Sequence, residues 1–231
     1  MFTGFPEETL QFFLDIRFHN DKAYFAEHKP RYERDVKAVF HAFIEELAPA
    51  MQEIDPLMEI RPYKCLARIH RDTRFTKDKS PFRDHLWLCF RRAAEPREGS
   101  VNFFFELGPT RLGWGMGTWG ENRPMMEVFR RRMAAEPEKY ARIIDGCHLE
   151  KNDFTVWNQT WKRMEVPPGL PLGLKGWYTS RDVYVGRTHP DMDAIGTHEI
   201  VDIVRKDFQT LAPLYHMLRG AYEEAADDQR M

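Results

Sequence analysis

Between Arg68 and Lys79 the chain carries an unusual density of charged side chains. A guanidinium group is planar, stays charged at any working pH and binds a carboxylate or a phosphate through two parallel hydrogen bonds. A lysine in the same segment adds a mobile point charge. The residue types therefore predict a site for a small phosphate- or carboxylate-bearing ligand. Its expected cationic side chains are Arg68, Arg71, Arg74 and Lys79.

Two carboxylates in this segment support a second interpretation. Asp72 and Asp78 are expected either to orient the guanidinium groups of a ligand site or to pair with them in a structural salt-bridge network. In the second case Arg71 or Arg74 would hold a long loop against a sheet. The sequence does not identify a general base, because His70, Asp72 and Asp78 are equally placed. An enzyme and a binding protein both remain open.

The charge of the chain is balanced in sum but uneven in place. Residues 61–97 hold 11 Lys and Arg against four Asp and Glu, a net charge of +7, and since the whole chain has a net charge of −2, the rest carries −9. A single basic segment in a near-neutral chain is suited to binding an anion locally. A broad nucleic-acid surface usually makes a whole domain basic, so nucleic acid is the less favoured partner. A nucleic-acid-binding module and an interaction protein with a purely structural Arg/Asp motif are the alternatives.

The same segment resembles the central motif of the uncharacterised bacterial family called domain of unknown function 2461. The motif stands here as R-I-H-R-D-T-R-F-T-K-D-K-S-P-F, residues 68–82, and ends in Phe82 where the family has Tyr. The opening GFPEETLQFFLDIRFHNDKAYFAEHKPRYE is also similar, as are the glycine-rich strand and the helix that follows it. The resemblance implies a mixed α+β domain and no established activity, substrate or cofactor. A role for the family's phenol as a proton donor cannot apply to Phe82, which has no hydroxyl.

A second pattern of interest is a strand with three alternating glycines, Gly113, Gly115 and Gly117. On one face they would form a flat trough that a backbone, an aromatic ring or a ligand can approach closely. The G-x-G-x-G spacing differs from a dinucleotide fingerprint and has no βαβ context. We expect close packing there, with a ligand trough as the alternative.

Other chemistry is not supported by the residue patterns. His189, Asp191 and Asp193 suit a turn as well as a metal site, and His198-Glu199 lacks the second histidine of a zinc-protease motif. We found no nucleophile elbow and no phosphate-binding glycine loop of the Walker type. We therefore expect no metal and no cofactor.

Helices are predicted before and after a run of strands. The apolar spacing is helical over the first 54 residues, with Asn20 as a cap and Pro30 in the first turn of a long helix. Later helices are expected after Asn122, at Pro137 and from Thr197 through Leu218, with a frayed acidic tail over 223–231. Apolar residues recur at every second position in four later segments, which predicts strands at Leu66–Arg71, His85–Arg92, Ser100–Leu107 and Leu112–Trp119. A short strand is predicted at 183–185.

Together these patterns predict one α+β domain over residues 1–231, with N-terminal helices and a C-terminal helix packed on a mainly antiparallel sheet. No apolar run approaches the ~20 residues of a membrane span. The acidic start is unlike a signal peptide and three cysteines are too few for a disulfide framework, so we expect a cytoplasmic protein. The oligomeric state is not predicted.

Overall fold

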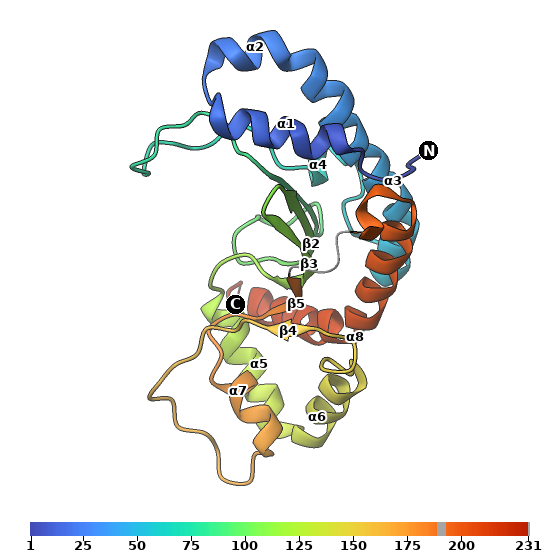
Figure 1. Cartoon of the computed structure of the whole chain (residues 1–231). Helices are drawn as coiled ribbons and strands as arrows, with labels where there is room; N and C mark the ends of the chain where they lie inside the picture. Colours follow the sequence, from blue (N-terminus) through green and yellow to red (C-terminus); the bar gives the residue numbers. More distant parts are fainter. Residues whose placement is uncertain (189–192, 231) are drawn as a thin grey trace. The chain divides into compact units, whose positions relative to one another are not determined.

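The computed structural model describes residues 1–188 and 193–230. The fold is α+β, with helices at both ends of the chain and an antiparallel five-stranded sheet between them, as predicted (Figure 1). Contacts between Cα atoms divide the chain into two compact units. Unit 1 comprises 1–90, 104–114 and 188–206, and unit 2 comprises 91–103, 115–187 and 207–231.

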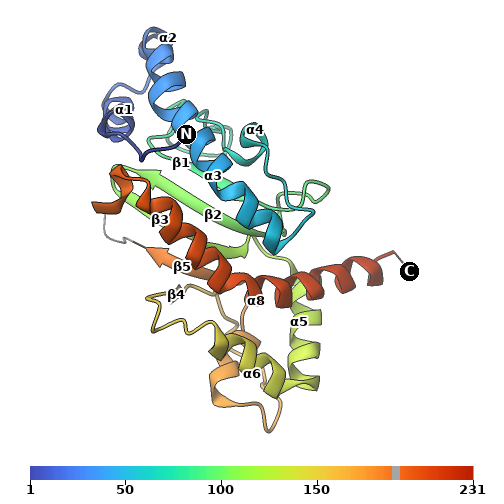
Figure 2. The same cartoon turned by 90° about the vertical axis from the view of Figure 1, so that its right-hand side faces the viewer.

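Unit 1 is built around one long helical run. This run consists of α2 (Lys22–Arg31), the π-helix η1 (Tyr32–Lys37) and α3 (Ala38–Ile54), and it is preceded by α1 (Glu7–Phe18) and followed by the short α4 (Pro62–Cys65). Helix α3 packs on strand β2 through Phe43 and Phe105, whose ring centroids lie 4.7 Å apart (Figure 2). Phe5 stacks on the same Phe105 ring at 5.6 Å. Apolar burial of these rings holds the helices of unit 1 on its strands.

Unit 2 contains two helices that pack on each other and on the later part of the C-terminal helix. These helices are α5 (Arg123–Ala135) and α6 (Pro137–Gly146), joined through the edge-to-face pair of Phe129 and Tyr140 at 5.5 Å. The Phe103 ring packs on Phe208 and Tyr215 of α8 (Glu199–Asp228), with ring centroids 5.0 and 5.1 Å apart. The remaining helices are η2 (Leu172–Leu174) and α7 (Lys175–Tyr178); η3 (Asp193–Gly196) belongs to unit 1.

The sheet has the strand order β1-β2-β3-β5-β4. Its strands are β1 (Leu86–Phe90), β2 (Val101–Gly108), β3 (Arg111–Thr118), β5 (Tyr184–Thr188) and β4 (Thr155–Val156). Strands β4 and β5 are antiparallel, with Thr155 opposite Gly186. The first three strands form the meander that their short connections predict.

The starts of α5 and α6 follow the predicted chemistry, whereas the starts predicted at Asn20 and Pro30 are wrong. Asn122 caps α5 by accepting from the Met125 N–H at 3.1 Å, and Pro137 opens α6. Asp21, rather than Asn20, caps α2, since its carboxylate accepts from the N–H groups of Ala23 and Tyr24.

Pro30 lies inside the long helical run and does not begin it. A proline removes one helical hydrogen bond, and the π-helical turns of η1 begin two residues later. Phe25 before this point and Tyr32 and Val36 after it are buried, so the run is packed on both sides of Pro30.

The strand predicted at Leu66–Arg71 is also wrong. This segment makes only two isolated antiparallel bridges, Leu66 with Leu88 and His70 with Phe82. Between the two bridges, the guanidinium of Arg83 donates hydrogen bonds to the carbonyl oxygens of Arg68, at 2.6 Å, and of His70. The two bridges are four residues apart on one side and six on the other, so the ladder is irregular between them and the alternating pattern does not become a continuous strand.

Helix α8 extends to Asp228, so residues 223–228 of the predicted frayed tail are helical. Its start agrees with the prediction, because the Thr197 hydroxyl accepts from the Glu199 N–H at 3.3 Å. Among the described residues we find no helix whose length and apolar content would allow it to cross a membrane.

Candidate functional site

Most charges of the Arg/Asp motif are paired within the motif itself. Arg74 donates to both carboxylate oxygens of Asp72, at 2.7 and 3.0 Å, and Arg71 pairs with Asp78. The Lys79 ammonium donates to the Thr73 carbonyl at 2.8 Å. These contacts hold an exposed loop that projects from the helices of unit 1 (Figure 1).

The pKa values of the two carboxylates reflect this pairing. Hydrogen bonds from the Arg74 side chain and backbone lower the pKa of Asp72 to about 2. Hydrogen bonds from Ser80, followed by that from Arg71, hold the pKa of Asp78 well below its usual range. Both groups are therefore ionised throughout the neutral range and act as anionic partners.

Arg71 also lines a polar cavity of about 340 Å³ in unit 1. We call its charged wall the saturated arginine cluster; it consists of Arg17, Arg71, Arg83 and Arg111 with Asp78, Asp84 and His85. Residues from α1, from the loop before β1 and from the start of β3 meet here. The cluster therefore joins chain segments that are far apart in sequence.

The guanidinium groups of this cluster all have partners in the fold. Arg17 meets Asp84 at 2.7 Å and Arg111 meets Glu106 of β2 at 3.4 Å. His85 bridges the two carboxylates, with its Nδ1 2.8 Å from Asp84 and its Nε2 3.4 Å from Glu106. Burial of Asp84 opposes its ionisation, but the hydrogen bonds from His85 and Arg17 outweigh this and lower its pKa.

A second cavity of unit 1, of about 310 Å³, contains the first arginine of the motif. We call it the Arg68 cavity. It lies between the long helical run and the segment that begins with α4, and α4 lies beside α3 (Figure 2). Its lining residues are Phe25, Lys29, Tyr32, Glu33, Lys37, His41, Tyr63, Leu66, Ala67, Arg68, Ile69 and His70.

The helical wall of the Arg68 cavity depends on the π-helix. Its residues Phe25, Lys29, Glu33, Lys37 and His41 follow one another at intervals of four. In an α-helix with 3.6 residues per turn, each step of four drifts around the axis by about 40°. A π-helix has more than four residues per turn, so in η1 a step of four residues falls short of a full turn and rotates in the opposite direction. The two rotations offset each other, and the row keeps facing one cavity.

The opposite wall is held by the interrupted ladder described above. The Ala67 N–H donates to the Trp87 carbonyl and the Arg83 N–H donates to the Ile69 carbonyl, at 2.9 and 2.8 Å. These bonds fix the backbone on either side of Arg68, whose exposed side chain is left to face the cavity. Phe82, the last residue of the motif, is buried and stacks on Phe25 with ring centroids 4.2 Å apart.

Several polar groups of the Arg68 cavity have no partner in the fold. Across residues 1–188 and 193–230, neither Lys29 nor Arg68 makes a side-chain hydrogen bond or an ion pair, and the hydroxyl of Tyr32 has no hydrogen bond. The only carboxylate in the lining, Glu33, meets Lys37 at 2.7 Å. Three cations against one anion give the lining a charge of +2 with its histidines neutral.

Burial shifts two titrations in this cavity. It raises the pKa of Tyr32 to about 12, so the hydroxyl remains a neutral donor at physiological pH. It also lowers the pKa of His41, with a further contribution from the charge of Lys37. The cavity thus offers fixed cations beside neutral hydrogen-bonding groups.

The structure does not bring the four predicted cations together. Arg68 and Arg71 line different cavities, and Arg74 and Lys79 line neither of these two. Sequence reasoning also missed the helical wall, for which the four-residue spacing from Phe25 to His41 was the available signal. The prediction for this part of the chain rests on the apolar spacing alone, which describes the buried face of the helices and not this row.

The predicted glycine trough is filled by backbone at two of its three positions. A Cβ on Gly115 would lie 2.1 Å from the Val185 carbonyl oxygen, and one on Gly117 would lie 2.4 Å from that of Val183. Gly113 is buried. The close approach permitted by Gly115 and Gly117 is therefore used by β5 and by Val183, the residue before it, which leaves no room for a ligand there.

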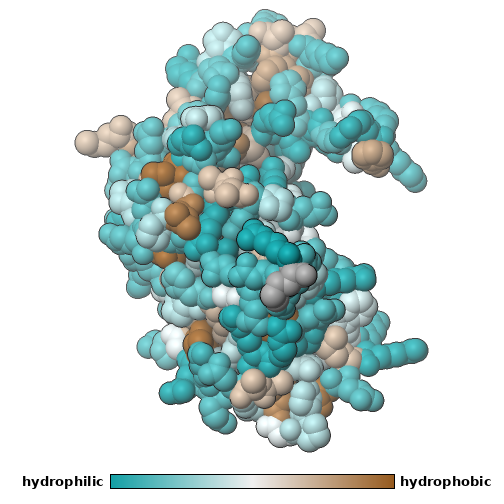
Figure 3. All heavy atoms as spheres, turned by 180° about the vertical axis from the view of Figure 1, so that it is seen from behind, coloured by the Kyte–Doolittle hydropathy of each residue, from teal (hydrophilic) through white to brown (hydrophobic). Residues whose placement is uncertain are grey.

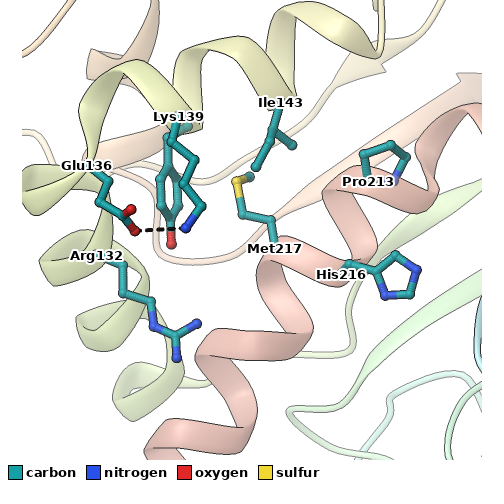
Figure 4. Close-up of a pocket in the computed structure, with 8 residues that line it drawn as sticks. Arg132, Glu136, Lys139, Ile143, Pro213, His216 and Met217 are labelled. Atoms are coloured by element: carbon teal, nitrogen blue, oxygen red, sulfur yellow. Dashed lines mark hydrogen bonds and ion pairs between the residues drawn. The ribbon is translucent and has the colours of Figure 1, made fainter.

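Unit 2 has a cavity of about 550 Å³ between α5, α6 and α8 (Figure 4). Its cations are already paired: Lys139 meets Glu136 at 2.9 Å, and Arg132 Nε donates to Glu224 at 2.6 Å. Ile143, Pro213 and Met217 supply an apolar side. This cavity lacks the free cations that distinguish the Arg68 cavity.

A metal site is not indicated among the residues that the structure describes, which include no group of three His, Cys, Asp or Glu able to hold an ion. The sequence pattern that suits a metal site as well as a turn consists of His189, Asp191 and Asp193, and the first two of these lie outside the described residues.

A family model described as "Conserved hypothetical protein (DUF2461)" matches residues 8–217. The chain belongs to this family. The match covers nearly all of both units, so the DUF2461 assignment includes the Arg68 cavity and the saturated arginine cluster. No curated protein and no solved structure matches the chain. The family is one of unknown function, so the function is inferred from the chemistry of the cavities.

Proposed function

We propose that this protein binds a small phosphate- or carboxylate-bearing ligand in the Arg68 cavity. The observation that carries the proposal is that two cations, Lys29 and Arg68, line one cavity from its two walls and have no ion-pair partner among the residues described. An anion that enters the cavity can form new charge-assisted hydrogen bonds with these cations without displacing an existing partner. Such hydrogen bonds are stronger than neutral ones. The saturated arginine cluster is the weaker candidate, since an anion there would have to displace existing carboxylate partners.

The test compares two arginines three residues apart. Binding of inorganic phosphate is measured by isothermal titration calorimetry at low ionic strength for the wild type, for Arg68→Gln and for the matched control Arg71→Gln. A lost hydrogen bond to a charged group costs about 1.5–3 kcal/mol, so Arg68→Gln should weaken binding at least about tenfold. Arg71→Gln should change the affinity by less than about threefold, because Arg71 already pairs with Asp78.

Circular dichroism and the thermal midpoint show whether each variant is folded. Absence of binding by the wild type both of inorganic phosphate and of the small phosphate and carboxylate ligands tested below would overturn the proposal. So would an equal loss in both variants, which would place the anion outside the Arg68 cavity.

A further inference from the structure

The walls of the Arg68 cavity are unusually aromatic for an anion site. Phe25, Tyr32 and Tyr63 line it together with the imidazole rings of His41 and His70. A site for a bare inorganic anion needs cations and N–H donors, and rings contribute little to it. The rings therefore indicate that the ligand has a second, apolar part.

Two of these rings are held rigidly. Phe25 stacks on Phe82 with ring centroids 4.2 Å apart. The centroid of the Tyr32 ring lies 5.4 Å from that of Phe25 and 5.7 Å from that of Phe12. A wall fixed on its far side in this way can present a ring without an entropic cost on binding.

The third ring lies on the opposite side and is open to solvent. Tyr63 is 63% exposed, and the cationic groups of Arg61 and Lys64 lie 5.8 and 5.7 Å from its ring. An exposed tyrosine at the entrance of a cavity can cover a ligand with its apolar face and keep its hydroxyl in water. Lys64 increases the positive potential there, whereas the charge of Arg61 is balanced by Glu59, whose carboxylate accepts from Arg61 Nε at 2.7 Å.

From this arrangement we infer that the ligand is a planar aromatic ring bearing one phosphate or carboxylate group. The anionic group meets Arg68 and Lys29, and the ring lies against Tyr63 and Phe25. The inference rests on the function proposed above, because the anion supplies the charge that the two cations lack.

The remaining polar groups and the size of the cavity agree with such a ligand. The Tyr32 hydroxyl can donate a hydrogen bond to an oxygen of the anion or to a ring substituent. A volume of about 310 Å³ is at the lower end for small-molecule sites, which run from roughly 300 to 1,000 Å³. A compact ligand of one ring system is therefore favoured over a dinucleotide.

The experiment uses pairs of ligands that differ only in the ring. Dissociation constants are measured for phenyl phosphate against methyl phosphate and for benzoate against acetate, with the wild-type chain, Tyr63→Leu and Arg68→Gln. The matched control is Tyr24→Leu, since Tyr24 lies on α2 but stacks on His28, outside the cavity lining. We expect the aryl ligand of at least one pair to bind about tenfold more tightly than its partner. The pair that shows the preference identifies the anionic group as phosphate or carboxylate.

Tyr63→Leu should reduce that preference to less than about threefold, and Tyr24→Leu should leave it unchanged. Equal binding of aryl and methyl ligands, with both weakened in Arg68→Gln, would overturn the aromatic ligand and leave the proposed function standing. Failure of all four ligands and of inorganic phosphate would overturn both. An aryl preference that survives Tyr63→Leu would show that the ring lies elsewhere.

Discussion

The saturated arginine cluster and the Arg68 cavity use neighbouring residues of one motif and have opposite electrostatic character. In the cluster, Arg17 and Arg111 meet carboxylates of the fold, and His85 connects those carboxylates. In the cavity, Arg68 and Lys29 have no such partners across the described parts of the chain.

The difference shows how a dense run of arginines can serve two purposes. An arginine whose charge is already met by the fold contributes to stability, and an arginine left facing a cavity is available to a ligand. Arg68 and Arg71 are only three residues apart, yet they line different cavities. Residue type alone does not separate such cases.

The largest expected effect is on stability, in the cluster. Asp84→Asn removes the charge that meets Arg17 and His85 and should lower the free energy of unfolding by about 1–3 kcal/mol. Urea unfolding measures this, with Glu27→Gln on the exposed face of α2 as a control that should change it by less than about 0.5 kcal/mol. Phosphate binding should be retained. An Asp84→Asn variant as stable as the wild type would contradict a structural role for the cluster.

A smaller effect, on affinity alone, is expected at the helical wall of the cavity. Lys29→Met removes an unpaired cation and should weaken phosphate binding about three- to tenfold while the thermal midpoint stays within the range of a surface substitution. Calorimetry of Lys22→Met, an exposed lysine of the same helix outside the cavity lining, provides the comparison. If both lysine variants lose affinity equally, general attraction by positive charge would explain the binding better than a site.

The smallest effect is a pH dependence of stability from His41. Burial lowers its pKa in the folded chain, so the unfolded chain takes up the proton at a higher pH than the folded chain does. Stability from this group is complete above the unfolded value of about 6.5 and decreases as the pH falls below it. Chemical unfolding between pH 8 and 5 should show a smaller decrease for His41→Gln than for the wild type. Identical pH profiles would contradict the shift.

Much of the fold is determined by local sequence patterns. The helix starting after Asn122 needs only a side-chain acceptor and an apolar face, and the strand at Leu86–Phe90 follows from alternation with Leu86, Leu88 and Phe90 buried. Predictions failed where a distant group changed the local preference. Asn20 does not cap a helix because it exchanges two hydrogen bonds with the main chain of Phe82, at 2.9 and 3.0 Å.

The sequence by itself determined the α+β class, the basic segment and the residue types suited to an anion. Only the tertiary structure decided which arginine is free, because that depends on carboxylates and carbonyls brought from other segments. Asp84 and Glu106 reach the cluster from separate elements, and the Arg83 side chain donates a hydrogen bond to the Arg68 carbonyl. The helical wall of the Arg68 cavity likewise passes through the π-helix η1, which the apolar spacing of the sequence does not predict.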